Sequence, residues 1–91
     1  MLIHIPTPLR AYTGQQESIS VLATTVAGSL EALVAQFPEL RPNLFGADGN
    51  LRSFVNLYLN DEDVRYLPEK DKTSVTEKDE LTIIPSIAGG L

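Results

Sequence analysis

Few side chains in this sequence are of the types that carry out catalysis. There is no cysteine, so the chain has neither a thiolate nucleophile nor a cysteine-based zinc site. The single histidine, His4, alternates with Ile3 and Ile5 and would face away from them on a strand. With no second histidine, we interpret it as a structural residue or a partner contact rather than a base or metal ligand. Ser86 has no histidine near it in the sequence and gives no nucleophile signature.

Acidic and glycine-containing segments do not predict a metal or nucleotide site either. Asp61, Glu62 and Asp63 are consecutive, and consecutive residues in an extended turn point in different directions, so a solvated turn is favoured over a metal cluster. The charged run over residues 77–80 is interpreted in the same way. Residues 46–50 contain two glycines but lack the lysine of a phosphate loop. We therefore expect no metal and no bound cofactor.

The feature that remains is the ending PSIAGGL, residues 85–91, in which a double glycine comes one residue before Leu91. Glycine has no Cβ, so its backbone can pass a narrow channel and adopt conformations that other residues cannot. Residues 85–90 can extend by roughly 3.3 Å each, which gives a reach of about 20 Å. We expect a folded domain over residues 1–85 and a flexible tail over residues 86–91. The alternative is a frayed terminus with accidental glycines.

The elements that must position this tail follow from the pattern of apolar residues. The strongest strand is residues 54–59, where Val55, Leu57 and Leu59 would share one face. Residues 41–51 are rich in Pro, Gly and Asn and predict a loop, and residues 60–63 predict a turn. Strands are also predicted at residues 2–5, 17–21 and 81–84, with a short edge strand at residues 64–67.

One helix is predicted between residues 24 and 37. Thr24 or Thr25 can cap its amino terminus, and Pro38 disfavours helical backbone at Phe37 and so ends it. The apolar residues between these ends have helical spacing and form one stripe: Val26, Leu30, Leu33, Val34 and Phe37.

The predicted order β-β-α-β-(β)-β requires the helix to bury its stripe on one face of a mixed sheet. Placing the first and last strands side by side and parallel at the centre gives a β-grasp arrangement. The expected fold is α+β, with a four- to five-stranded sheet and one main helix packed on one face. The other face would present His4, Tyr58 and Ile84 beside the tail. Together with Asp61 and Glu62 in the solvated turn, these are the candidate partner-binding residues.

Length and charge restrict the function classes. Ninety-one residues make one domain, and a net charge of −5 argues against nucleic acid and favours a basic partner surface. No apolar run approaches the roughly 20 residues needed to span a bilayer, and the start MLIHIPTPLR lacks the pattern of a signal peptide. The absence of cysteine suits a reducing compartment. We expect a cytoplasmic protein with no membrane partner.

Two segments carry a resemblance to a known family. DELTIIPSIAGG, residues 79–90, resembles the ending of the MoaD/ThiS-like β-grasp sulfur carriers: an acidic turn, an apolar strand, a proline and a small residue before Gly-Gly. FVNLYLNDEDVR, residues 54–65, is similar to the cysteine-biosynthesis branch and less like the molybdopterin branch. The resemblance covers essentially the whole chain. Leu91 departs from it, because active members end on the second glycine.

The resemblance implies a carrier rather than an enzyme. The carboxylate of Gly90, at the end of a tail with Ala88 and Gly89, would be adenylated with ATP by a partner similar to ubiquitin-activating enzymes and then converted to a thiocarboxylate. The sulfur would pass to a cysteine synthase-like enzyme. Leu91 would first be removed, and a JAMM-type zinc peptidase is a candidate for that step; otherwise Leu91 is an extension that is tolerated or inactivating.

Two other functions remain open from the sequence. In the first, the chain is the small subunit of a molybdopterin synthase, and the tail enters the active site of the large subunit. In the second, which is of another class, the chain is a non-covalent ubiquitin-like binding module or a protein modifier.

Overall fold

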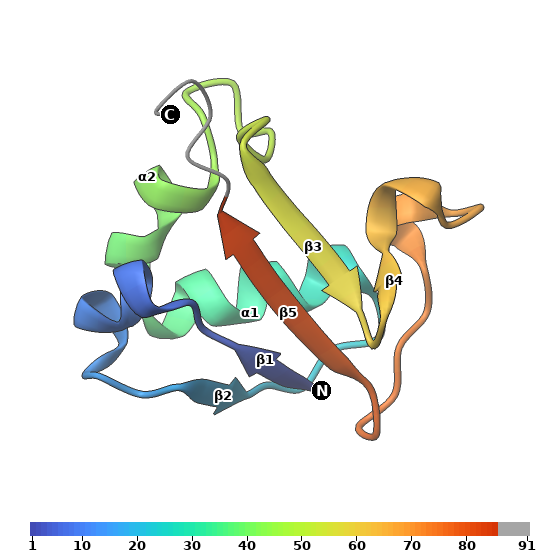
Figure 1. Ribbon diagram of the computed structural model, residues 1–91, viewed down its shortest axis with the longest axis horizontal. Helices are drawn as coiled ribbons and strands as arrows, with labels where there is room; N and C mark the ends of the chain where they lie inside the picture. Colours follow the sequence, from blue (N-terminus) through green and yellow to red (C-terminus); the bar gives the residue numbers. More distant parts are fainter. Residues whose placement is uncertain (86–91) are drawn as a thin grey trace.

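The computed structural model describes residues 1–85, and the predicted tail, residues 86–91, lies outside the described residues. Figure 1 shows the arrangement of the elements. In chain order, these are β1 (Leu2–His4), the 3-10 helix η1 (Thr7–Thr13), β2 (Ser18–Ser20), α1 (Val26–Gln36), the 3-10 helix η2 (Pro38–Leu40), α2 (Arg41–Leu44), β3 (Val55–Leu59), β4 (Glu62–Asp63), the 3-10 helices η3 (Val64–Tyr66) and η4 (Lys70–Lys72), and β5 (Glu80–Pro85).

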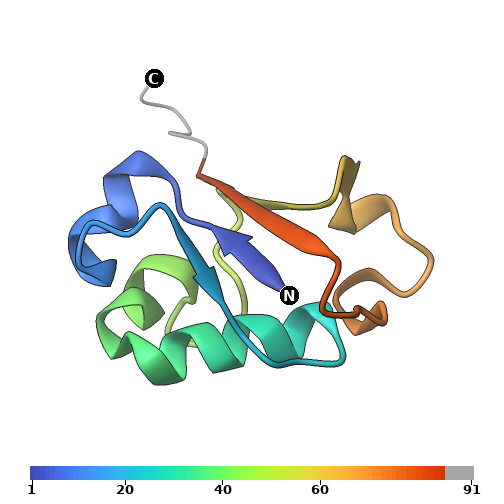
Figure 2. The ribbon, with the colours of Figure 1, turned by 90° about the horizontal axis from the view of Figure 1, so that it is seen from below.

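The five strands form one mixed sheet in the order β2-β1-β5-β3-β4. β1 and β5, the first and last strands, are parallel neighbours at the centre, and the other pairs are antiparallel. Figure 2 shows α1 lying along one face of this sheet. The structure confirms the predicted architecture, including the parallel central pair. β5, from which the tail continues, is the middle strand of the sheet.

The helix α1 matches its sequence prediction. The Thr25 hydroxyl oxygen accepts a hydrogen bond from the Gly28 backbone N–H (3.0 Å), which satisfies one of the free donors of the first turn. The helix ends at Gln36, and Phe37 leaves helical geometry at φ −130° before Pro38. The predicted stripe packs into the core, with four of its residues buried and Phe37 partly buried: Val26, Leu30, Leu33, Val34 and Phe37.

Replacing the capping residue gives a first test of this account. Thr25→Ala should lower the free energy of unfolding by about 1 kcal/mol, because the Gly28 N–H loses its acceptor. Thr25→Ser keeps a hydroxyl oxygen at the same place and should retain most of that stability. Urea denaturation of the two variants makes the comparison. Equal losses would show that the hydroxyl does not act as a cap.

Two local predictions are wrong. Residues 41–51 are not all loop, because α2 occupies Arg41–Leu44 and its Leu44 is fully buried. Pro42 lies in the first turn of α2, where its missing N–H breaks no helical hydrogen bond. The edge strand is not at residues 64–67 but at Glu62–Asp63, so Glu62 lies in a strand rather than in a turn.

The chain turns away after β4 for a local reason. The Asp63 carboxylate accepts a hydrogen bond from the Arg65 backbone N–H (2.9 Å) and caps η3, so Val64–Tyr66 forms a 3-10 turn instead of continuing the strand. No helix within residues 1–85 is long and apolar enough to cross a membrane.

Candidate functional site

The root of the tail is fixed by the last strand. The predicted working residues Ala88, Gly89 and Gly90, and the predicted processed residue Leu91, all lie outside the described residues. The last described residue, Pro85, was expected to stop the strand but is its final residue, opposite Val55 of β3.

The register explains why a proline is tolerated at this place. The Asn60 N–H donates to the Glu80 carbonyl (2.7 Å), so Asn60 and Glu80 form a hydrogen-bonded pair. Such pairs recur at every second residue along β3 and β5, and Pro85 lies at a position where β3 and β5 exchange no hydrogen bonds. On its other side β1 pairs with β5 only as far as Thr82, so the missing N–H of Pro85 breaks no ladder bond. The chain therefore enters the tail from a strand held in register by β3.

The face of the sheet opposite α1, called the free face below, brings three predicted partner residues together. Thr82 of β5 lies between His4 of β1 and Tyr58 of β3, because both are its register partners. Ile84 lies two residues further along β5, toward the tail root, and is 44% exposed. The intervening residues of these strands are buried beneath α1, as alternation requires. The structure thus places His4, Tyr58 and Ile84 on one face, with Ile84 next to the root of the tail and His4 and Tyr58 further back, level with Thr82.

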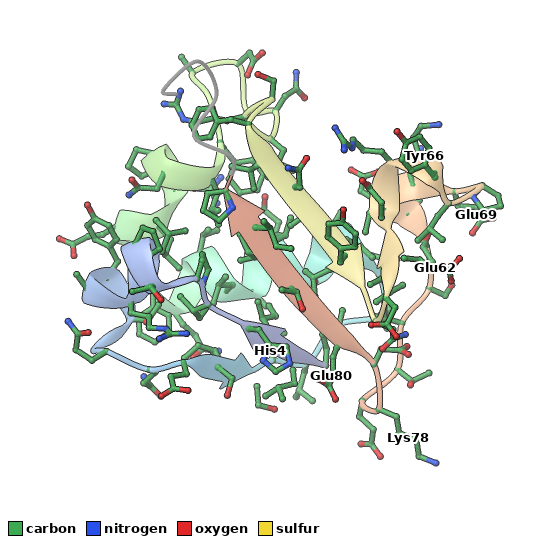
Figure 3. All side chains as sticks on the ribbon, in the orientation of Figure 1. His4, Glu62, Tyr66, Glu69, Lys78 and Glu80 are labelled. Carbon is green, nitrogen blue, oxygen red and sulfur yellow. The ribbon has the colours of Figure 1, made fainter. Side chains whose placement is uncertain are left out.

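His4 has a partner that sequence reasoning missed. Its Nε2 atom lies 2.6 Å from Glu80 Oε1, and Figure 3 shows the two side chains side by side on β1 and β5. These side chains are 41% and 55% exposed, so water screens the pair and we expect it to add little stability. Glu80 was interpreted only as part of a solvated charge run. The parallel register of β1 and β5, which the sequence does not state, is what brings it to His4.

The other two predicted partner residues, Asp61 and Glu62, lie at the end of the sheet opposite the tail root. β3 runs from Val55, beside the tail root, to Leu59, and Asp61 and Glu62 follow it. Both are exposed, and Figure 3 shows Glu62 beside the last part of β3, where it is the register partner of Leu59. The structure therefore places Asp61 and Glu62 away from Ile84 and the tail root, but near Tyr58, whose register partner on β4 is Asp63.

A small hydrogen-bond network holds in place the segment that contains Asp61 and Glu62, called the acidic end below. Asn60, in left-handed backbone geometry at φ 57°, donates from its side-chain amide to Asp79 (3.2 Å), and its side-chain oxygen accepts from the Glu80 N–H (3.1 Å). The Thr76 backbone N–H also donates to Asp79 (2.8 Å). The Thr76 N–H and then the Asn60 amide hold the pKa of Asp79 below its usual value.

Metal binding is not suggested by the arrangement of acidic residues and histidine. Within residues 1–85, no group of three or more such side chains is placed to hold a metal ion. Asp63, a member of the acidic run, is instead bound to Arg65, with an Nη2–Oδ2 distance of 2.9 Å. The Arg65 guanidinium is the main reason that the pKa of Asp63 lies below its usual value.

Comparison with known proteins connects this geometry to a family. The model of the ThiS family matches residues 3–90, which is nearly the whole chain. The chain belongs to the ThiS family. This assignment confirms the predicted family of β-grasp sulfur carriers and its fold.

Relatives of known name or structure agree with the ThiS assignment. The sulfur carrier protein CysO of Mycobacterium tuberculosis is 38% identical over 90 residues, which cover 97% of this chain and 96% of the relative. A chain in the crystal structure of the Amycolatopsis orientalis BexX/CysO complex superposes with a TM-score of 0.85, at 34% identity and 98% coverage of both chains. The structure of SAMP1 from Haloferax volcanii superposes with a TM-score of 0.83 at 28% identity, covering 99% of this chain and 98% of that one.

Proposed function

We propose that the chain carries sulfur as a thiocarboxylate on Gly90 and delivers it in cysteine biosynthesis. The carboxylate oxygen of Gly90 attacks the α-phosphate of ATP and releases pyrophosphate, which leaves an acyl-adenylate. Hydrosulfide then attacks the acyl carbon, AMP leaves, and the new carbon–sulfur bond, once the S–H proton is lost, completes the thiocarboxylate. The observation that carries this proposal is the extent of the family match, which includes both glycines and ends at Gly90. The similarity to CysO supports cysteine biosynthesis as the destination.

The partners supply the catalytic groups in this proposal, and the chain is a co-substrate rather than an enzyme. An adenylyltransferase similar to ubiquitin-activating enzymes binds ATP, and a sulfur-accepting synthase takes the product. A relative that is crystallised in a BexX/CysO complex supports the view that such carriers bind partner proteins. The cytoplasm, which the cysteine-free sequence suits, is the proposed location.

Removal of Leu91 is part of the proposal. While Leu91 is present, the carbonyl of Gly90 belongs to a peptide bond and offers no carboxylate to ATP. A peptidase, for which a JAMM-type zinc enzyme is our candidate, would cleave after Gly90. The family match that ends at Gly90 supports this step.

The free face is the proposed docking surface. Ile84 lies on β5, from which the tail continues, and His4 and Tyr58 lie on the two strands beside it, so a partner that covers them is well placed to receive the tail. Ile84 is an exposed apolar residue on this face, next to the tail root, which is typical of an interface contact. Asp61 and Glu62, at the other end of the sheet, would act by attracting a basic partner surface over a longer range.

Charge reversal at the acidic end tests this role. Asp61→Lys and Glu62→Lys should slow association with the activating enzyme severalfold at low salt, with the difference shrinking as salt increases. Because both residues are exposed, the free energy of unfolding should change by less than about 0.5 kcal/mol. Glu39→Lys, an exposed change in η2, is the matched control. Stopped-flow association rates that are equal for all three variants at every salt concentration would exclude steering by this end.

A second function, protein modification, is favoured by one observation. The small archaeal modifier protein 1 of Haloferax volcanii is 36% identical over 66 residues, or 72% of this chain. In that case the activated Gly90 would be joined to an amine of another protein instead of receiving sulfur.

Intact mass measured on the chain isolated from its native cells separates the two functions. A carrier pool contains a form that ends at Gly90 and has one oxygen replaced by sulfur. A modifier gives conjugates of higher mass that survive denaturation. A pool with neither form would contradict both proposals.

A further inference from the structure

A groove beside β3, distinct from the free face, has the features of a second binding surface. Its volume is about 340 Å³, in the range of small binding pockets, and it is open to solvent. The floor is apolar and consists of the buried side chains Val55, Leu57 and Val64 with the half-buried Leu51. These side chains lie on the α1 side of the sheet, whereas His4, Tyr58 and Ile84 lie on the free face.

The groove exists because β4 is short. β4 pairs with β3 only at Tyr58 and Leu59, so the outer edge of β3 from Val55 to Leu57 has no neighbouring strand. The hydrogen-bonded pairs of β3 with β5 include Tyr58 and alternate along the strand. The backbone N–H and C=O of Leu57 therefore point away from β5, toward the gap left by β4. An open strand edge of this kind can accept hydrogen bonds from, and donate them to, an extended peptide.

The rim of the groove is basic although the chain is acidic. It contains Arg52, Arg65 and Lys70, which are three of the seven Lys and Arg residues, and one carboxylate, Asp71. Arg65 is engaged by Asp63, as described above. Its charge is therefore partly neutralised, and the other two cations decide what the rim can bind.

Arg52 and Lys70 are available to a ligand. Arg52 is held by a hydrogen bond from its Nε to the Pro42 carbonyl (2.8 Å), and its guanidinium stands 6.0 Å from the ring centroid of Phe54. Its terminal nitrogens make no hydrogen bond to a residue within 1–85, so the fork that suits a carboxylate is free there. Lys70 forms no ion pair with any residue in the described part of the chain.

We propose that this groove binds an extended acidic segment of a partner protein. One large apolar side chain of the segment would lie on the floor, its backbone would pair with the edge of β3 at Leu57, and its carboxylates would meet Arg52 and Lys70. The charge of the rim selects an acidic partner, and the open strand edge favours a peptide backbone over a free small anion. Asp61 and Glu62 are expected to attract a basic surface of a partner, whereas the groove would bind an acidic segment. The two surfaces can therefore bind different partners or different parts of one partner.

The test is an NMR titration of the ¹⁵N-labelled full chain with an N-acetylated, C-amidated pentapeptide that has a central phenylalanine flanked by aspartate and glutamate. Saturable shifts are expected at the amides of Leu57, Val64 and Lys70, and those of His4 and Ile84 should not move. The same peptide with lysines in place of its acidic residues should not bind. No saturable shift at millimolar peptide, or equal binding of the lysine peptide, would overturn the proposal. So would equal binding of phenylacetate, because the groove would then be a site for small apolar anions.

Two substitutions test whether the side chains of Arg52 and Lys70 contribute to peptide binding. Arg52→Gln and Lys70→Gly should each weaken binding about tenfold, the effect of losing one charge-assisted contact. Lys70 has left-handed backbone geometry at φ 49°, which glycine adopts readily, so Lys70→Gly should keep the fold. Gln15→Gly makes the same backbone change at φ 66° away from the groove, and Lys78→Gln removes an exposed charge from another turn. Both controls should bind the peptide unchanged, and a loss in the controls equal to that in the rim variants would contradict the assignment.

Discussion

A chain that ends at Gly90 should support ATP–pyrophosphate exchange by the cognate activating enzyme at least about a hundredfold faster than a chain that retains Leu91. The enzyme must place a carboxylate oxygen beside the α-phosphate of ATP, and an error of about 1 Å in such placement can cost roughly a hundredfold in rate. One additional residue displaces the carboxylate by about 3.3 Å, or brings an isobutyl side chain into a channel that suits glycine. Equal exchange rates for the two chains would show that Leu91 is a harmless extension.

The matched control keeps the length and changes only the last residue. A chain that ends at residue 90 and carries Gly90→Ala should lose sulfur loading while its thermal unfolding stays nearly unchanged, because the folded core lies within residues 1–85. The two readouts separate a role in chemistry from a role in stability. A large shift of the melting temperature would mean that the tail is a structural element, and the carrier proposal would lose its main support.

The largest loss of stability is expected at the centre of the α1 stripe. Leu33→Ala should lower the free energy of unfolding by about 2–5 kcal/mol, because the Leu33 side chain is 0% exposed and its removal leaves a cavity. Domains of this kind have a total stability of about 5–15 kcal/mol, so the loss is a large share of the total.

Leu22 provides the control for this substitution. It is 94% exposed in the segment between β2 and α1, so Leu22→Ala removes the same atoms with no buried contact to lose. Its free energy of unfolding should stay within about 0.5 kcal/mol of the parent. Urea denaturation of both variants provides the comparison. Similar losses at the two positions would contradict the assignment of the α1 stripe to the core.

The parts of the fold that the sequence predicted well have strong local signals. The α1 helix combines a capping Thr25, a stripe of apolar residues at helical spacing and a proline just after its end. β3 alternates buried and half-buried residues through five positions. In both cases every local preference agrees with the tertiary packing, and such agreement makes a segment readable from its sequence.

The elements that were missed are short, and their signals compete with turn residues. Leu40 and Leu44 are both fully buried and are four residues apart, which is the helical spacing that could have revealed η2 and α2. The prolines and the asparagine around these leucines favour a loop and so conceal the helical spacing. β4 contains two residues whose side chains are charged, so no apolar alternation marks it, and only pairing with β3 defines it.

The candidate functional residues divide in the same way. The double glycine and the free-face residues could be found from sequence, because the first is a contiguous motif and the second follows from strand alternation. The contact between His4 and Glu80 depends on the register of two strands at opposite ends of the chain. The groove beside β3 is assembled from residues 51–53, 55, 57, 64–65 and 70–71, and its basic rim has no contiguous signal.

The most direct test of the carrier proposal is the intact mass of the chain ending at Gly90 after incubation with its activating enzyme, ATP and a sulfide donor. The account predicts a product heavier by the exchange of one oxygen for one sulfur, with the change confined to the carboxyl-terminal residue in fragment spectra and absent when ATP is omitted. An unchanged mass, under conditions in which the same enzyme converts its own established carrier, would contradict the account.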